Sequence, residues 1–327
     1  MTESRTNSEA RATAATWITE SRLPFQAAFI GGSLAWADPA AAYDPASDID
    51  CYLVVDGKPP EGKIGKITVE GVLLDISWLL WQQLADAESH AVLPSLLHFG
   101  RIVRDDDEKL TALQQRISGR FTDEDRIATR LSDMRTRIRS GLSGDSSHLP
   151  APEQLMNWLF PATLATHMPL VAACVPLTVR KRFLAARRVM QLAEYEGLLK
   201  LYGFDSVPPV QAQAWLDDTA TLFDHTAPIA EGSTRFWASD IQAGARHIAI
   251  CGSQELIDTG FHREALYWII ATRTRCLTVL HDAGEDTAPF VAAFAAMTDT
   301  LSIATSGQRA ARTEAILAWV DSRLSPI

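Results

Sequence analysis

The 327-residue sequence predicts an α+β protein, with a small mixed sheet near the start of the chain followed by an all-helical part. Two changes of pattern predict this order. Over about the first hundred residues, β-rich or buried apolar runs alternate with turn residues. From about residue 106 onward, apolar residues recur at helical spacing. A succession of strands and then helices is typical of α+β proteins.

One helix and five strands are expected in the first part. The helix covers 11–23 and ends where Pro24 interrupts the helical spacing. The strands are expected over 26–30, 49–55, 63–70, 72–79 and 100–103. The third and fourth strands are separated by Glu70-Gly71, a pair that is typical of a tight hairpin turn.

Long helical patterns fill the rest of the sequence. Helices are expected over 110–117, 127–138, 153–168, 178–203, 209–224, 234–250, 255–283, 287–304 and 308–324. A Gly-, Ser- and Pro-rich stretch at 141–152 is the best linker candidate. We therefore predict two domains, over 1–142 and 150–327, and the motifs of the first lie within 25–80.

Composition and charge limit the kinds of partner. The net charge of −10 and the pI of about 5.3 argue against binding to duplex nucleic acid, because phosphate neutralisation needs a basic face. No uncharged apolar run reaches the roughly 18 residues of a membrane span. Residues 1–15 lack the apolar core of a signal peptide, so a cytoplasmic protein is expected. The cysteines form no C-x-x-C pair, and buried free thiols are expected.

Two aspartates mark the start of the second predicted strand. Asp48 and Asp50 are two residues apart, so both carboxylates project from one face of a strand, while Ile49 and Cys51 point into a core. Adjacent carboxylates repel each other unless a cation lies between them. Mg²⁺ prefers hard oxygen ligands of this kind together with substrate phosphates. The pair therefore predicts a magnesium site.

Two further motifs strengthen this prediction. Asp75 interrupts an apolar strand, where a carboxylate is costly unless a neighbouring group, such as a metal site, serves as its partner. Gly31-Gly32-Ser33 lies where a strand ends and a helix is expected to begin. Glycine lets a phosphate approach the backbone, and the N–H groups of a turn and a helix start favour anions. The combination predicts a metal and phosphate site.

Each motif taken alone has a simpler interpretation. Asp48 is also explained as a turn or cap residue, and Asp50 as a solvated residue of an edge strand. Asp75 is also explained as the partner of a buried Lys or Arg, and the two glycines as a tight turn only. An acidic helical scaffold with aspartates that serve no metal is therefore an alternative to the metal site.

The ordered motifs resemble those of the DNA polymerase beta-type nucleotidyltransferase superfamily, whose pattern is hG[GS], a spacer, [DE]h[DE]h and a third carboxylate on a later strand. Here the pattern is formed by 29–33, 47–50 and 73–77. The arrangement is similar to that of small bacterial nucleotidyltransferases that modify antibiotics and carry a helical domain. The spacer between Ser33 and Asp48 is longer than usual, and Leu34 follows the glycine motif where many relatives have a basic residue.

The resemblance implies a transferase that moves a nucleoside monophosphate from a nucleoside triphosphate, with ATP as the expected donor, to an acceptor hydroxyl. It implies that Asp48 and Asp50 hold two Mg²⁺ ions, and that Asp75 binds the ion on the nucleophile side and helps to accept the hydroxyl proton. It also implies that the triphosphate is bound by Gly31, Gly32 and Ser33.

Positive charge for the triphosphate is expected from the helical part, because no basic residue follows the glycines. Lys181 and Arg188 lie near one stripe of a predicted helix and are the first candidates, followed by Arg263. The alternative is a solvated charged face beside a buried seam at Phe183, Met190 and Leu184.

The motifs do not specify the acceptor. A cationic small molecule such as an aminoglycoside suits an acidic chain, and a hydroxyl of a protein is equally compatible. The rival class is a non-catalytic nucleotide-binding or regulatory module, although binding alone does not need three carboxylates. Base preference and oligomeric state are left open.

Overall fold

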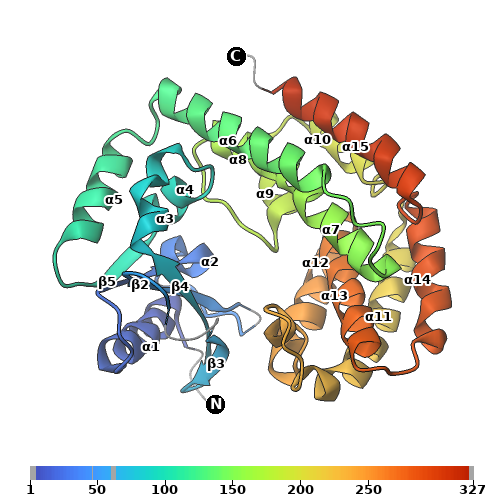
Figure 1. The fold of residues 1–327 in the computed structure, drawn as a ribbon, viewed down its shortest axis with the longest axis horizontal. Coiled ribbons are helices and arrows are strands. Elements are labelled where there is room, and N and C mark those ends of the chain that lie inside the picture. The colour runs from blue at the N-terminus through green and yellow to red at the C-terminus, as the bar shows by residue number, and fades with distance from the viewer. Residues whose placement is uncertain (1–4, 46, 60–63, 324–327) are drawn as a thin grey trace. The chain divides into compact units, whose positions relative to one another are not determined.

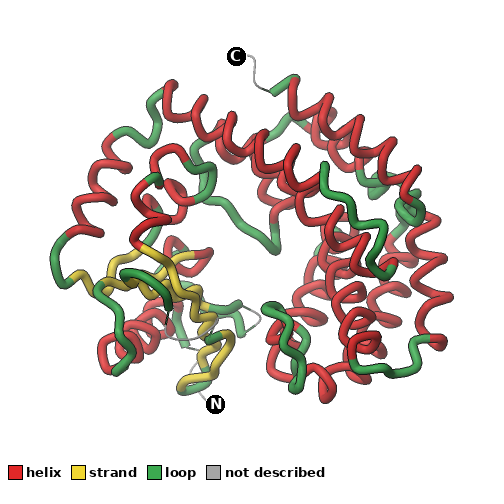
Figure 2. The backbone as a smooth tube through the Cα atoms, in the orientation of Figure 1, coloured by secondary structure: helices red, strands yellow, loops and turns green. Residues whose placement is uncertain are grey.

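The structure of the chain is a computed structural model that describes residues 5–45, 47–59 and 64–323. It is an α+β protein, as predicted, and every strand of the described residues lies in the N-terminal part of the chain (Figure 2). The chain forms two compact units. The first consists of Met1–Asp133 and Val171–Thr178, and the second of Met134–Leu170 and Val179–Ile327.

The first unit contains a five-stranded mixed sheet (Figure 1). Its strands are β1 (Ala27–Gly31), β2 (Ile49–Val55), β3 (Gly65–Val69), β4 (Val72–Leu80) and β5 (Arg101–Asp105). Their order is β3-β4-β2-β1-β5, with β2 and β4 parallel and the other neighbours antiparallel. The five predicted strands are confirmed with small changes of their ends, except that residue 63 lies outside the described residues. Because β2 has a neighbour on each side, Asp50 is not an edge residue, and that alternative is wrong.

The predicted hairpin is confirmed between β3 and β4. Val69 pairs with Val72, which leaves Glu70 and Gly71 as a two-residue turn. Both turn residues have positive φ, 48° and 78°. Positive φ at both central positions is what a type I′ turn requires, and this turn matches the twist of the strands.

The two faces of the sheet pack against different helices. Helices α1 (Asn7–Glu20) and α2 (Gly32–Trp36) contribute to the core on one face, where Ile49 and Cys51 are buried as predicted. Helices α3 (Trp81–Ala85), α4 (Leu93–His98) and α5 (Lys109–Gly119) contribute to the core on the other, together with Phe29 and Val54. Side chains alternate between the faces of a strand, so Asp50 lies on this second face.

Helix α1 begins earlier than the predicted range 11–23. Thr6 and Glu9 form a capping box, in which each side chain accepts a hydrogen bond from the backbone N–H of the other. Arg11 is buried, and its Nη1 donates to the carbonyl oxygens of Leu34 and Ala37, each at 2.9 Å. These bonds fasten the short helix α2 to α1.

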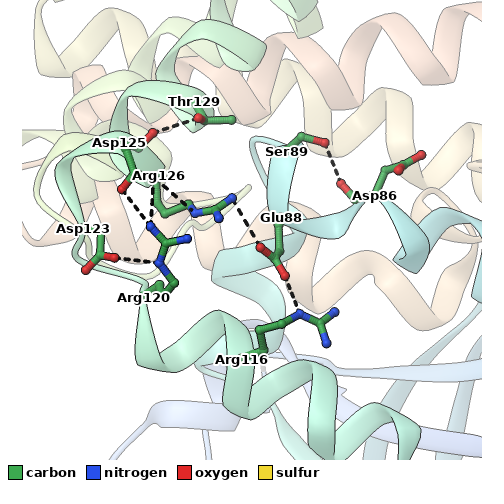
Figure 3. Close-up of polar contacts among 9 residues, drawn as sticks. All are labelled: Asp86, Glu88, Ser89, Arg116, Arg120, Asp123, Asp125, Arg126 and Thr129. Atoms are coloured by element: carbon green, nitrogen blue, oxygen red, sulfur yellow. Dashed lines mark hydrogen bonds and ion pairs between the residues drawn. The ribbon is translucent and has the colours of Figure 1, made fainter.

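Ion pairs on the first unit connect the short 3-10 helix η1 (Ala87–Ser89) with α5 and the start of α6 (Glu124–Leu142) (Figure 3). The pairs are Arg116–Glu88, Arg126–Glu88, Arg126–Asp125, Arg120–Asp123 and Arg120–Asp125. The hydrogen bond from Arg116 holds the pKa of the Glu88 carboxyl below its usual value. The side chains are largely solvated, so each pair contributes little to stability.

Helices make up most of the second unit. After α6 they are α7 (Ala151–Thr163), η2 (Leu164–Thr166), α8 (His167–Ala172), α9 (Arg182–Val189), α10 (Leu192–Leu201), α11 (Pro209–Ala230), η3 (Ala238–Asp240), η4 (Ala243–Ala245), η5 (His247–Cys251), α12 (Gly252–Asp258), α13 (His262–Asp282), α14 (Ala288–Thr300) and α15 (Ser306–Asp321). Among the described residues, none of these helices combines the length and the apolar character needed to cross a membrane.

Four of the predicted helices are divided or absent in the structure. The range 153–168 is divided into α7, the 3-10 helix η2 and the start of α8. The range 178–203 is divided into α9 and α10, and 255–283 is divided into α12 and α13 at Gly260, whose φ is 84°. The prediction of one helix over 234–250 is wrong, because this range forms short 3-10 turns and the start of a π-helical turn. Residue 324, the predicted end of the last helix, lies outside the described residues.

The division between the units falls within α6 and not in the stretch 141–152. Residues 171–178 return to the first unit. There the backbone N–H of Leu177 donates to Ser95 Oγ at 3.3 Å, and the Cys174 thiol lies against Phe121 and Arg130. The first unit is therefore built from two separate stretches of chain. Whether 1–142 and 150–327 act as functional domains stays a prediction.

Candidate active site

A row of residues crosses four neighbouring strands at one end of the sheet. Lys66 of β3 pairs with Asp75 of β4, Asp75 pairs with Asp50 of β2, and Asp50 pairs with Gly31 of β1. Paired residues on neighbouring strands project on the same face. The strands therefore bring two of the predicted carboxylates and the glycine turn to one place.

The glycine turn and Asp50 are in close contact. Strand β1 ends at Gly31, and α2 begins at Gly32, whose φ is 65°. A Cβ atom at Gly32 would lie 1.8 Å from Oδ2 of Asp50. The backbone conformation therefore favours glycine at this position, and a side chain there would displace the Asp50 carboxylate. A Cβ at Gly31 would likewise lie 2.8 Å from the Tyr52 ring.

Lys66 connects the third carboxylate to the row. Its Nζ lies 3.2 Å from Oδ2 of Asp75 and also donates to Oδ2 of Asp48, the residue before Ile49 at which β2 begins. The exposed fractions of the side chains are 10% for Lys66, 12% for Asp75 and 27% for Asp48. Partial burial strengthens the attraction between these charges relative to a pair in bulk water.

The negative charges of the three aspartates raise the pKa values of the same two neighbouring side chains. Burial, followed by the charges of Asp50, Asp75 and Asp48, raises the pKa of the Cys51 thiol to about 12. The same causes, in the same order, raise the pKa of the Tyr52 hydroxyl well above its usual value. Of the sequence-predicted residues, Asp50 lies beside Gly32 and is paired with Asp75, and Asp75 shares Lys66 with Asp48.

Tyr43 holds the loop that carries Asp48. Its hydroxyl donates to the carbonyl oxygen of Ser47 at 2.7 Å and accepts from the N–H of Leu73 on β4 at 3.4 Å. Burial raises the pKa of this hydroxyl, an effect larger than the opposing one of the Leu73 N–H. Because these bonds connect the residue before Asp48 to the strand of Asp75, Tyr43 helps to set the spacing between the two carboxylates.

The variant Tyr43→Phe is expected to lower the free energy of unfolding by about 1–3 kcal/mol, because the Ser47 carbonyl and the Leu73 N–H lose a buried partner. The measurement is urea unfolding followed by circular dichroism. A midpoint and slope equal to those of the parent protein would contradict this role of the hydroxyl.

The carboxylates fit a divalent cation by their chemistry more than by their present arrangement. Among the described residues, no group of three or more His, Cys, Asp or Glu side chains is arranged as a metal centre. Carboxylate oxygens nevertheless suit a hard cation. Two of the carboxylates, Asp48 and Asp75, already bind the ammonium group of Lys66, which occupies the place that a metal cation could take. The alternative that Asp75 pairs with a buried basic residue is confirmed, and magnesium binding stays a prediction.

Ser33 is exposed in the first turn of α2, next to Gly32. It is therefore accessible to a phosphate, as the predicted phosphate turn requires. Binding of phosphate by Gly31, Gly32 and Ser33 stays a prediction.

The basic candidates of the helical part are described within the second unit. Lys181 precedes α9, and its Nζ lies 3.4 Å from Glu255, while Arg188 is exposed. Arg263 makes two hydrogen bonds with Glu196, at 2.6 and 2.8 Å. A role of Lys181 and Arg188 in triphosphate binding stays a prediction.

Arg182, which lies in the same basic run as Lys181, is a core residue. It is 2% exposed, donates to Thr163 Oγ1 at 2.8 Å, and lies 4.3 Å from the centre of the Tyr267 ring. Phe183 and Leu184 of the predicted seam are buried, while Met190 is half-buried. The charged run therefore has residues both in the core and at the surface.

Sequence reasoning missed Lys66, although a signal was present. Once Glu70-Gly71 is taken as a two-residue turn, counting back along both strands sets Lys66 opposite Asp75. The comparisons with known proteins add no assignment, because no protein-family model matches the chain and the search of curated proteins finds no match.

Proposed function

We propose that the chain is a magnesium-dependent nucleotidyltransferase that moves a nucleoside monophosphate from a nucleoside triphosphate to an acceptor hydroxyl. The observation that carries the proposal is the contact of Asp50 with Gly32 in a row that also contains Asp75. Phosphate transfer needs carboxylates that hold a divalent cation beside a backbone that a triphosphate can approach. The row supplies both at one end of the sheet.

In this proposal each residue has a defined task. Asp48, Asp50 and Asp75 supply carboxylate oxygens to magnesium, which when bound neutralises phosphate charge and orients the reacting oxygens. The backbone N–H groups of Gly32 and Ser33 bind phosphate oxygens of the donor. Asp75 accepts the proton of the attacking hydroxyl.

The reaction is balanced without a further reactant. The acceptor oxygen forms a bond to the α-phosphorus, and the bond from that phosphorus to the oxygen bridging to the β-phosphate breaks. The electron pair of the broken bond leaves with pyrophosphate, and the hydroxyl proton passes to the carboxylate. The acceptor we propose is a small cationic molecule with hydroxyl groups, such as an aminoglycoside, because the chain is acidic.

The direct test is transfer of label from α-³²P-labelled ATP in the presence of Mg²⁺, with a panel of aminoglycosides and of protein hydroxyl acceptors. The other three nucleoside triphosphates are compared with ATP as donors. Metal-dependent formation of a labelled acceptor together with pyrophosphate is the expected result. Binding of Mg²⁺–ATP without transfer to any acceptor would instead support the non-catalytic nucleotide-binding module. Absence of both binding and transfer would contradict the proposal.

A further inference from the structure

The position of Lys66 affects the number of divalent metal ions that the candidate site can bind. The resemblance predicts two Mg²⁺ ions, of which one is shared with Asp75. The ammonium group of Lys66, however, already lies against both Asp48 and Asp75. The ammonium group of Lys66 therefore already binds two of the carboxylates that the two predicted ions would need.

Lys66 is held in this place by the sheet. Its backbone is paired with Asp75 across the antiparallel strands β3 and β4, and its side chain is only 10% exposed. The hairpin turn at Glu70-Gly71 fixes the register of these strands. A slip by one residue would turn Lys66 to the opposite face, so its approach to the carboxylates follows from the fold.

An ammonium group and a second divalent ion compete for the same carboxylates. Like charges at short distance repel strongly in a partly buried site, and each carboxylate oxygen that accepts from Lys66 has less capacity for a metal ion. Asp50 lies on the side of the row that faces Gly31 and Gly32. The place of Lys66 therefore favours one divalent ion in addition to the chain's own cation.

We propose that Lys66 serves as a resident cation of the site, so that the protein binds one divalent ion, and not two, with its nucleotide. This inference rests on the proposed function. In the metal-free protein, Lys66 also relieves the repulsion between Asp48 and Asp75 and keeps the two carboxylates together. The conservative variant Lys66→Arg retains this charge, and Lys66→Met removes it at similar side-chain length.

The test counts ions directly. Native mass spectrometry of the full chain with Mn²⁺ and α,β-methylene ATP gives the number of Mn²⁺ ions in each protein–nucleotide complex. One ion is expected for the parent protein and for Lys66→Arg, and two for Lys66→Met. Mn²⁺ is also expected to raise the Tm of Lys66→Met by about 2–4 °C more than that of the parent, because the ion then replaces the missing charge.

The outcomes separate this inference from the proposed function. Two Mn²⁺ ions per complex in the parent protein would overturn the role of Lys66 and leave the nucleotidyltransferase proposal in place. One ion in both the parent and a folded Lys66→Met would also overturn it. A parent protein that binds neither the analogue nor Mn²⁺ would overturn both. Should Lys66→Met not fold, Lys66→Gln takes its place, with two ions expected for it and one ion overturning the inference.

Discussion

The variant Asp50→Asn is expected to lose nucleotidyl transfer by a factor on the order of 10²–10³ or more, with little change in stability. Asp50 contributes the carboxylate that lies directly over Gly32. An amide has nearly the same shape, so the fold is retained, but it lacks the negative charge that a divalent cation needs. The measurement is the transfer rate with α-³²P-labelled ATP at saturating Mg²⁺, together with the Tm.

Asp56→Asn is the matched control. Asp56 follows the other end of the same strand and its side chain is exposed, so the same chemical change there is expected to leave the rate unchanged. Equal rates for the parent, Asp50→Asn and Asp56→Asn would show that the row of carboxylates does not carry the reaction.

The variant Gly32→Ala is expected to lower the free energy of unfolding by about 3–5 kcal/mol. Two costs add at this position. An alanine at a φ of 65° is strained by about 1–2 kcal/mol, and its Cβ would overlap Oδ2 of Asp50 at 1.8 Å. Urea unfolding measures the total, and transfer is expected to fall with it because the carboxylate must move.

Gly57→Ala separates the two costs. Gly57 also has a positive φ, 72°, but a Cβ there meets no other atom within 4 Å. This variant should therefore show the backbone cost alone, about 1–2 kcal/mol. When Gly32→Ala is made in a chain that already carries Asp50→Ala, its cost is expected to fall toward that of Gly57→Ala, because only the Cβ of residue 50, 3.3 Å away, remains close. A cost that is the same with and without the Asp50 side chain would refute the contact.

The sheet could be predicted from local signals. Each of its strands is a short run of β-forming or apolar residues bounded by turn residues, and the hairpin was indicated by Glu70-Gly71 alone. The strand order depends on pairing between distant segments, which no local pattern contains. It is this order that makes β2 an interior strand and that decides against the interpretation of Asp50 as an edge residue.

The candidate site was predicted in part. Asp48 and Asp50 are indicated because adjacent carboxylates on one strand face repel each other without a cation, and Asp75 because a carboxylate in an apolar strand is costly without a partner. Lys66 was missed because a lysine in a short polar strand is ordinary, and only the pairing register gives it significance. Tyr43 was not recognised as a loop-holding residue, since its partners, a carbonyl and an N–H of distant backbone, have no sequence signature.

The helical part shows where periodicity fails. The range 234–250 has apolar spacing that suits a helix, yet it forms short turns. Arg182 lies in a run of charged residues that suggests a solvated face, although Thr163 and Tyr267 make a buried place for it. In both cases tertiary packing overrides the local preference, which is a weak determinant of structure.

Because residues 171–178 belong to the first unit, they affect when this unit can fold during synthesis. In this segment the N–H of Leu177 donates to Ser95, and Cys174 lies against Phe121. The N-terminal unit is therefore complete only after α6, α7 and α8 have been translated in full. Its assembly therefore lags behind synthesis of its own strands. A chimera that replaces the C-terminal half from any point before residue 179 would therefore lose all or part of the segment 171–178 that belongs to the N-terminal unit.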